Sequence, residues 1–272
     1  MKILINDNGH TIRLVIPTGL ICSKPGIRLA IGAAQIYAPE AMEDVSPEAV
    51  IKNAIANGIE LMGISDHYYG IVMNRPGVTY ENAGHMIITH NNALKRYFEH
   101  IKILAEKYKD YIEVWCGIEI TAIDKGFTLL PDGVDVSMFD YCLIENFQYG
   151  ESVIDNIFDF AARCGCERTG LAHMDLPAYI LSKGSDMNEF FRKMKEQNIF
   201  WELNVNYDSK HNFNEHQYVK DFFGNDILID AVKKSGMKMS VGFDGHQLED
   251  YNADRVINAC NRLEELSVPM IK

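Results

Sequence analysis

Short apolar segments alternate along the chain with longer segments whose apolar residues recur at helical spacing. The short segments are rich in β-branched residues, and this pattern predicts buried strands. Strands that alternate with helices form parallel sheets, so the sequence predicts an α/β fold. The seven expected strands cover residues 13–21, 60–67, 112–121, 141–146, 169–175, 200–206 and 238–246.

Residues that favour helix ends mark the segments between these strands. Ser46 and Pro47 predict the start of one helix, and Gly58 predicts its end. Ser185 is the expected N-terminal cap of a later helix. Further helices are expected over residues 82–108, 153–164, 186–197, 226–234 and 253–266. Seven strand–helix units without a linker or an internal repeat predict one domain over residues 1–272, closed or nearly closed as a barrel, with a doubly wound open sheet as the alternative.

The charge balance limits the classes of partner. The 272 residues include 38 acidic and 26 basic side chains, which gives a net charge of −12. A surface this negative repels phosphate backbones, so we expect no nucleic-acid partner, whereas a small anionic substrate needs only a few cations or metal ions in one pocket. The N-terminus lacks the apolar segment of a signal peptide, and no apolar run reaches the ~20 residues of a membrane span. We therefore expect a soluble cytoplasmic protein without a membrane partner, and its six cysteines are expected to be buried thiols.

Polar side chains lie at the carboxyl ends of six of the seven predicted strands. They are Asp66, His67, Glu119, Glu145, Asn146, His173, Asp175, Glu202, Asn204, Asp244 and His246. One such residue is typical of a helix cap or a loop contact. Six strands that all end this way favour a functional site, because the carboxyl ends of parallel barrel strands meet at one rim and a buried ionisable group costs several kcal/mol unless it is paired or metal-bound. Imidazole together with carboxylate suits zinc, manganese or iron.

Four segments resemble motifs of the polymerase-and-histidinol-phosphatase (PHP) superfamily. Residues 63–67 resemble its TDH motif, residues 117–119 its strand-end glutamate, residues 171–175 its GHPD segment and residues 242–246 its SDAH segment. The resemblance implies a single-domain distorted (β/α)7 TIM-like barrel of the PHP type, histidinol-phosphatase-like. It also implies up to three divalent metal ions and the hydrolysis of phosphoesters.

The chain departs from the family pattern at three positions, one of which is the absence from residues 23–31 of a histidine that the family has shortly after its first strand. Residues 16–21 contain no histidine where the family has His-x-His on its first strand, and the fourth strand ends in Glu145 and Asn146 instead of serine and histidine. The resemblance therefore implies a depleted site with fewer than three ions, or none, although Glu145 or Asn146 can take the fourth-strand role. The metal ligands that it implies are Glu119, His173, Asp244, His67 and His246, and the catalytic residues that it implies are Asp66, His67 and His246.

Cations near the predicted rim are the candidate contacts for a phosphate group. Lys24 and Arg28 follow the predicted first strand, and Arg75 follows the second. The sequence favours a metal-dependent phosphoesterase that acts on a small phosphorylated molecule. The alternative is a catalytically inactive barrel that binds a ligand or a partner protein. A metal-dependent amidohydrolase or deaminase also expects a first-strand His-x-His, and its absence counts against that class.

Overall fold

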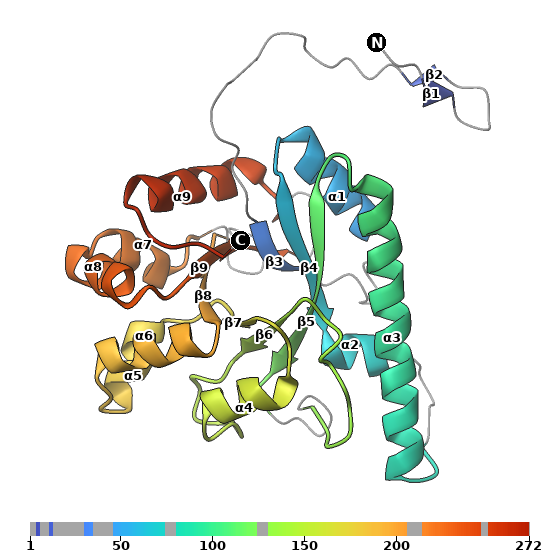
Figure 1. Cartoon of the computed structure of the whole chain (residues 1–272), viewed down its shortest axis with the longest axis horizontal. Coiled ribbons are helices and arrows are strands. Elements are labelled where there is room, and N and C mark those ends of the chain that lie inside the picture. Colours follow the sequence, from blue (N-terminus) through green and yellow to red (C-terminus); the bar gives the residue numbers. More distant parts are fainter. Residues whose placement is uncertain are drawn as a thin grey trace.

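A parallel sheet lies at the centre of the computed structural model (Figure 1). The structure describes residues 46–73, 80–123, 130–205, 214–245 and 250–271, and the backbone of 4–5, 11–12 and 30–34. The sheet has the strand order β10-β3-β4-β5-β6-β7-β8-β9, and each neighbouring pair is parallel. Its strands are β3 (Ala30–Ala34), β4 (Leu61–His67), β5 (Glu113–Thr121), β6 (Tyr141–Glu145), β7 (Thr169–Leu171), β8 (Ile199–Asn204), β9 (Met239–Gly242) and β10 (Asp244–Gly245). A separate antiparallel pair joins β1 (Leu4–Ile5) and β2 (Thr11–Ile12).

The two ends of the sheet are joined through consecutive residues. β9 pairs with β8 and β10 pairs with β3, and Phe243 alone separates β9 from β10. The sheet therefore curves back on itself, as in a TIM-like barrel, and the predicted α/β class is confirmed.

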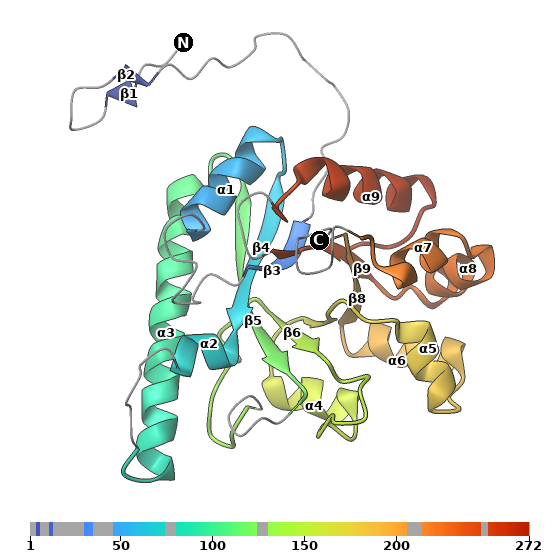
Figure 2. The same ribbon diagram turned by 180° about the vertical axis from the view of Figure 1, so that it is seen from behind.

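Helices cover the outside of the curved sheet in both views (Figure 1 and Figure 2). They are α1 (Pro47–Ala56), α2 (Tyr68–Met73), α3 (Ala83–Tyr108), α4 (Ile157–Cys164), α5 (Leu176–Ser182), α6 (Met187–Glu196), α7 (Gln217–Phe223), α8 (Asp226–Ser235) and α9 (Ala253–Glu265). The Ser46 side chain accepts the Ala49 N–H at the start of α1, as predicted. Asp186 caps α6 through the N–H of Glu189, so the expectation for Ser185 is wrong by one residue. No helix among these described elements is long and apolar enough to cross a membrane.

The strand beside β4 differs from the expected one. This position in the sheet belongs to β3, Ala30–Ala34, whereas the strand predicted over residues 13–21 lies outside the described residues. The β3 sequence is Ala-Ile-Gly-Ala-Ala, which has little intrinsic preference for a strand. Its pairing with β4 on one side and β10 on the other outweighs that weak preference.

Every second residue of the strands faces the inside of the curved sheet. Near the amino ends of the strands this inner face is apolar, with a buried cluster of Leu61, Trp115, Tyr141, Leu143, Ala172, Phe200 and Ile271. A Cβ atom on Gly63 would lie 2.6 Å from the Tyr141 hydroxyl, and one on Gly117 would overlap the Tyr141 ring. The two glycines thus give the fully buried Tyr141 ring its space, and a packed layer closes one end of the interior.

Candidate metal centre

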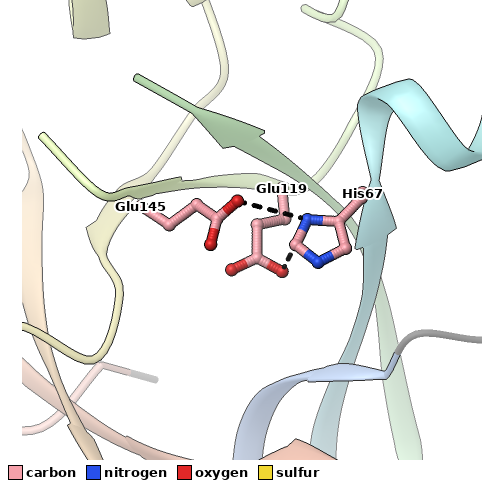
Figure 3. Close-up of side chains that lie close together, drawn as sticks. All are labelled: His67, Glu119 and Glu145. Carbon is pink, nitrogen blue, oxygen red and sulfur yellow. Dashed lines mark ion pairs between the residues drawn. The ribbon is translucent and has the colours of Figure 1, made fainter. Parts of the chain in front are cut away.

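The inner face becomes polar toward the carboxyl ends of the same strands. His67 is the last residue of β4 and lies on the same face as Ser65. It is paired in register with Glu119 of β5. Glu145 is the last residue of β6 and is paired with Thr121 of β5. The alternation of the strands therefore directs the three side chains toward one another, as Figure 3 shows.

These three side chains form one group of potential ligands. The Nδ1 atom of His67 lies 3.6 Å from Oε2 of Glu119 and 3.4 Å from Oε1 of Glu145. One donor atom from each of the three residues lies within 4.8 Å of the others, and all three residues are buried. Neither carboxylate oxygen of Glu119 has a hydrogen-bond partner among the described residues. A buried carboxylate without hydrogen bonds, beside an imidazole and a second carboxylate, fits a divalent cation.

His173 approaches the same two carboxylates from the other side. Its Nε2 atom lies 3.6 Å from Oε1 of Glu119 and 3.6 Å from Oε2 of Glu145. Glu119 and Glu145 each use one oxygen toward His67 and the other toward His173. Two imidazoles and two carboxylates therefore alternate around one small space.

The two carboxyl groups differ in their affinity for a proton. Burial and the nearby charge of Glu145 raise the pKa of Glu119 to about 8. Burial also acts to raise the pKa of Glu145, but the close approach of His173 and the charge of His67 outweigh it and the pKa is lowered. Without a cation, Glu119 is the member of the pair that holds a proton near neutral pH, and binding of a cation would release that proton.

A third carboxyl group, Glu202 on β8, lies behind His173. Its Oε2 accepts the backbone N–H of His173 at 2.9 Å, and only 1% of the residue is exposed. Burial raises the pKa of Glu202 to about 8. Burial alone would lower the pKa of the His173 imidazole, but Glu119 and Glu145 raise it well above its ordinary value. The acidic groups therefore favour a positive charge at this point, whether from an imidazolium or from a bound cation.

Two further predicted residues lie among the described ones. Asp244 is on β10, and its charge contributes to the pKa values of Glu119, Glu202 and His173, which places it near them. Asp66 is buried, and its Oδ1 accepts the backbone N–H of His67 at 2.7 Å.

The remaining predicted residues are two asparagines, a helix cap and a group that the structure does not describe. Asn146 donates a hydrogen bond to the Thr121 hydroxyl at 3.1 Å, and Asn204 is buried at the end of β8. Asp175 caps α5 through the N–H of Ala178, which is the simple role that its sequence position allowed. Outside the described residues lie His246 and the three candidate phosphate contacts Lys24, Arg28 and Arg75.

Sequence reasoning undervalued Glu145 and did not place Tyr69 against the His67 ring. Glu145 was expected only as a substitute in the fourth-strand position, yet it completes the group with His67 and Glu119. The signal was the polar end of an apolar strand. Tyr69 stacks on the His67 ring with 4.7 Å between ring centroids, and burial together with the charge of Glu145 raises the pKa of its hydroxyl to about 12. Its position two residues after His67 was the available signal.

The first-strand histidines are missing from the observed strand as well as from the predicted one. β3 reads Ala30-Ile-Gly-Ala-Ala34 and contains no histidine. The shift of the first strand from residues 13–21 to β3 therefore leaves the departure from the PHP pattern unchanged.

The chain was also compared with known proteins. No protein-family model matches the chain, and no curated protein matches it. A solved structure of histidinol phosphate phosphatase from Lactococcus lactis subsp. lactis Il1403, complexed with zinc, L-histidinol and phosphate, is similar in fold, with a TM-score of 0.53 and 18% identity over 89% of this chain and 95% of that one.

Two other solved structures are less similar. A chain of archaeal ribonuclease P, determined by cryo-electron microscopy with mature tRNA, has a TM-score of 0.44 and 12% identity over 87% of each chain. The 7,8-dihydropteroate synthase of Vibrio fischeri ES114 has a TM-score of 0.37 and 10% identity over 89% of this chain and 78% of that one. The comparison with the Lactococcus lactis enzyme confirms the expected histidinol-phosphatase-like fold.

Proposed function

We propose that the chain is a metal-dependent phosphoesterase that acts on a small phosphorylated molecule. The observation that carries this proposal is the convergence of His67, Glu119 and Glu145 at the carboxyl ends of three neighbouring parallel strands. In parallel α/β barrels this is the end of the sheet where active sites lie. Both Glu119 oxygens are buried and have only the His67 and His173 imidazoles opposite them, each at 3.6 Å, which supports a cation as a closer partner.

The proposal includes a fold assignment finer than the α/β class. We take β9 and β10 as one strand interrupted at Phe243, which gives a seven-stranded (β/α)7 barrel of the PHP type in one domain over residues 1–272. The fold likeness to a histidinol phosphate phosphatase supports this assignment and suggests phosphate monoesters as the first substrates to test.

In the proposed mechanism the side chains divide into ligands and proton carriers. Glu119 and Glu145 would hold a zinc, manganese or iron ion together with His67, and His173 would complete the same group from the opposite side. Such an ion, when bound, supplies a Lewis acid and lowers the pKa of a coordinated water toward ~7.

The remaining roles are proposed for residues of β4 and β10 and for residues outside the described part of the chain. Asp244 adds negative charge beside Glu119 and is proposed as a further ligand. Asp66 orients His67 through its backbone N–H, and His246 is proposed to protonate the leaving oxygen. Lys24, Arg28 and Arg75 are proposed to contact the phosphate group.

The first test measures metal content and hydrolysis in the same preparations. We would purify the protein without added metal or chelator, measure zinc, manganese and iron by elemental mass spectrometry, and assay a panel of small phosphomonoesters that includes L-histidinol phosphate. The wild-type chain is expected to carry at least one equivalent of metal and to release phosphate. The Glu119→Gln variant is expected to lose both properties, because the ion loses its central charged ligand.

The matched control is Glu113→Gln, which changes the same residue type on the same strand. Glu113 is exposed at the start of β5 and accepts the indole N–H of Trp115, a contact that glutamine can keep. This variant is expected to retain metal and activity. Full activity in the Glu119→Gln variant would contradict the proposal.

The second candidate function is a catalytically inactive barrel that binds a ligand or a partner protein. It is favoured by the absence of histidine in β3 and by the ion pairs of 3.4–3.6 Å through which the four side chains neutralise one another without a metal. For this function we expect no metal after purification, none after incubation with zinc, manganese or iron, and a melting temperature that a chelator does not change.

A further inference from the structure

The backbone at His173 has a conformation that few side-chain-bearing residues adopt. Its φ angle is +31°, in the left-handed region that favours glycine. The residue lies two positions after the end of β7 and three before the start of α5, so the chain turns at this point. Strained residues of this kind persist only where surrounding contacts hold them, and they concentrate at functional sites.

We propose that Glu202 and Trp201 are positioning residues that hold the His173–Met174 turn so that the His173 imidazole faces Glu119 and Glu145. This inference rests on the proposed metal site. It assigns Glu202 a role through the backbone of a ligand and not as a ligand itself.

Glu202 holds the turn from inside the sheet. Its carboxylate accepts the His173 N–H at 2.9 Å, and the residue is 1% exposed, so water does not compete for this hydrogen bond. A hydrogen bond from an N–H to a charged or buried carboxyl group is among the stronger ones in proteins. The contact fixes the backbone at the residue whose side chain lies 3.6 Å from both glutamates.

Trp201 holds the same turn from the opposite face of β8. Its indole N–H donates to the carbonyl oxygen of Met174 at 3.0 Å, and its side chain is fully buried. Adjacent residues of a strand point to opposite faces, so Glu202 and Trp201 contact neighbouring residues of the turn from two sides. Two contacts on neighbouring backbone groups restrict rotation of the turn more than either contact alone.

The strand that carries both residues is itself braced by α7. The Tyr218 hydroxyl accepts the Asn204 N–H at 2.8 Å and donates to the Glu202 carbonyl oxygen at 3.3 Å. Tyr218 is buried, and its ring centroid lies 6.1 Å from that of Trp201. These contacts fix the β8 backbone at the two positioning residues. The orientation of His173 is therefore set by the strand next to its own and by the helix that packs on that strand.

The test separates the hydrogen bond from the charge of Glu202. Chelator-treated protein would be titrated with zinc ion by calorimetry for the wild type, Glu202→Gln and Glu202→Met. Methionine removes the acceptor at similar size, and we expect zinc affinity to fall by about 10- to 100-fold, as is typical when a group that orients a metal ligand is lost. Glutamine keeps an acceptor oxygen, so we expect affinity within about threefold of the wild type.

A second measurement, hydrogen exchange at the His173 backbone amide, reports on the turn itself and does not need a metal. Hydrogen exchange at the His173 amide in metal-free protein is expected to be slow in the wild type and in Glu202→Gln, and at least tenfold faster in Glu202→Met. Trp201→Phe removes the indole N–H together with part of a fully buried ring, but it leaves the Glu202 hydrogen bond to the His173 amide in place, so we expect a smaller increase at the same amide. This variant also serves as the second reading if Glu202→Met does not fold.

The matched control is Ser240→Ala. Ser240 is paired with Glu202 in the β8–β9 register and is fully buried, so the variant changes the neighbouring buried polar residue and leaves the turn intact. We expect its zinc affinity and His173 exchange rate to equal those of the wild type.

Two results would overturn the inference. An equal loss of zinc affinity in Glu202→Gln and Glu202→Met would mean that Glu202 binds the ion directly. Unchanged exchange at His173 in Glu202→Met would mean that the turn does not need the carboxyl group. If the wild type binds no zinc, manganese or iron, the proposed function fails, but the exchange measurement still decides whether the turn is held as inferred.

Discussion

Two regions of the inner sheet face are equally buried but have opposite chemistry. Near the amino ends of the strands, Phe200 and Tyr141 are 1% and 0% exposed and pack against other apolar groups. Near the carboxyl ends, Glu119 and Glu202 are each 1% exposed and lie among charged groups. Burial of the apolar region stabilises the fold, whereas burial of several carboxyl groups costs several kcal/mol unless cations or hydrogen bonds compensate.

The difference separates a half of the inner face that stabilises the fold from a half that carries the proposed metal site. The alternation of the strands is the same in both halves, so geometry alone does not produce the contrast. The contrast comes from the residue types at the last inward-facing positions of each strand. We therefore expect substitutions in the apolar half to affect unfolding, and substitutions in the polar half to affect metal binding while the fold persists.

The largest expected effect is in the apolar half. Phe200→Ala should lower the free energy of unfolding by about 3–5 kcal/mol, because it removes a fully buried ring and leaves a cavity. The measurement is urea denaturation followed by circular dichroism. Ile227→Ala is the control, since Ile227 is 84% exposed, and we expect a change within about 0.5 kcal/mol. Similar losses in both variants would contradict the division of the inner face.

The next effect is in the polar half and concerns metal affinity. Glu145→Gln should reduce zinc affinity at least about tenfold, because the ion loses one of its charged ligands while the glutamine side chain keeps the same size. The melting temperature of the metal-free protein should stay close to that of the wild type. Glu151→Gln, which changes an exposed glutamate after β6, should bind zinc as the wild type does. Calorimetric titration measures both variants, and equal zinc affinity in the two would remove Glu145 from the site.

The buried carboxyl groups of the polar half should also make the stability of the protein depend on pH. The pKa of Glu119 is raised to about 8 in the fold, against about 4.3 in an unfolded chain, so at intermediate pH the folded protein binds more protons than the unfolded chain. The contribution of Glu119 to the free energy of unfolding is fully present below pH ~4.3 and is lost as the pH rises through about 8. The raised pKa of His173 acts in the same direction.

We therefore expect the metal-free protein to lose stability between about pH 5 and pH 8. A saturating divalent ion should reverse this trend, because it replaces the proton on Glu119 and binds more tightly as pH rises. Urea titrations at several pH values, with chelator and with zinc, measure both trends. In Glu119→Gln the fall in stability with pH should be smaller than in the wild type. A metal-free wild-type protein that gains stability across this range would contradict the assignment.

The sequence was sufficient for the parts of the fold that depend on local patterns. The apolar runs that end in His67 and Glu119 identified both strands, and the cap at Ser46 located the start of α1. β3 was missed because its alanines and glycine lack a strand preference, and only pairing on both sides makes the segment a strand.

The contacts within the site depend on the curvature of the sheet, which the sequence does not encode locally. Polar strand ends predicted a shared rim, but not that Glu145 would lie between His67 and His173. The left-handed backbone of His173 is likewise held by Glu202, which is 29 residues away in the chain. Neither feature follows from the residues next to it, so both require the folded arrangement.

The smallest expected effect concerns a polar residue in the polar half that takes no part in the site. The Ser240 hydroxyl is buried and has no hydrogen-bond partner among the described residues, so it contributes desolvation without a compensating bond. Ser240→Ala should therefore leave the free energy of unfolding unchanged or raise it by less than about 1 kcal/mol. Urea denaturation of metal-free protein measures it. A loss above about 1 kcal/mol would show that the Ser240 hydroxyl makes a stabilising contact. Polar residues in the polar half would then stabilise the fold as well as form the proposed site.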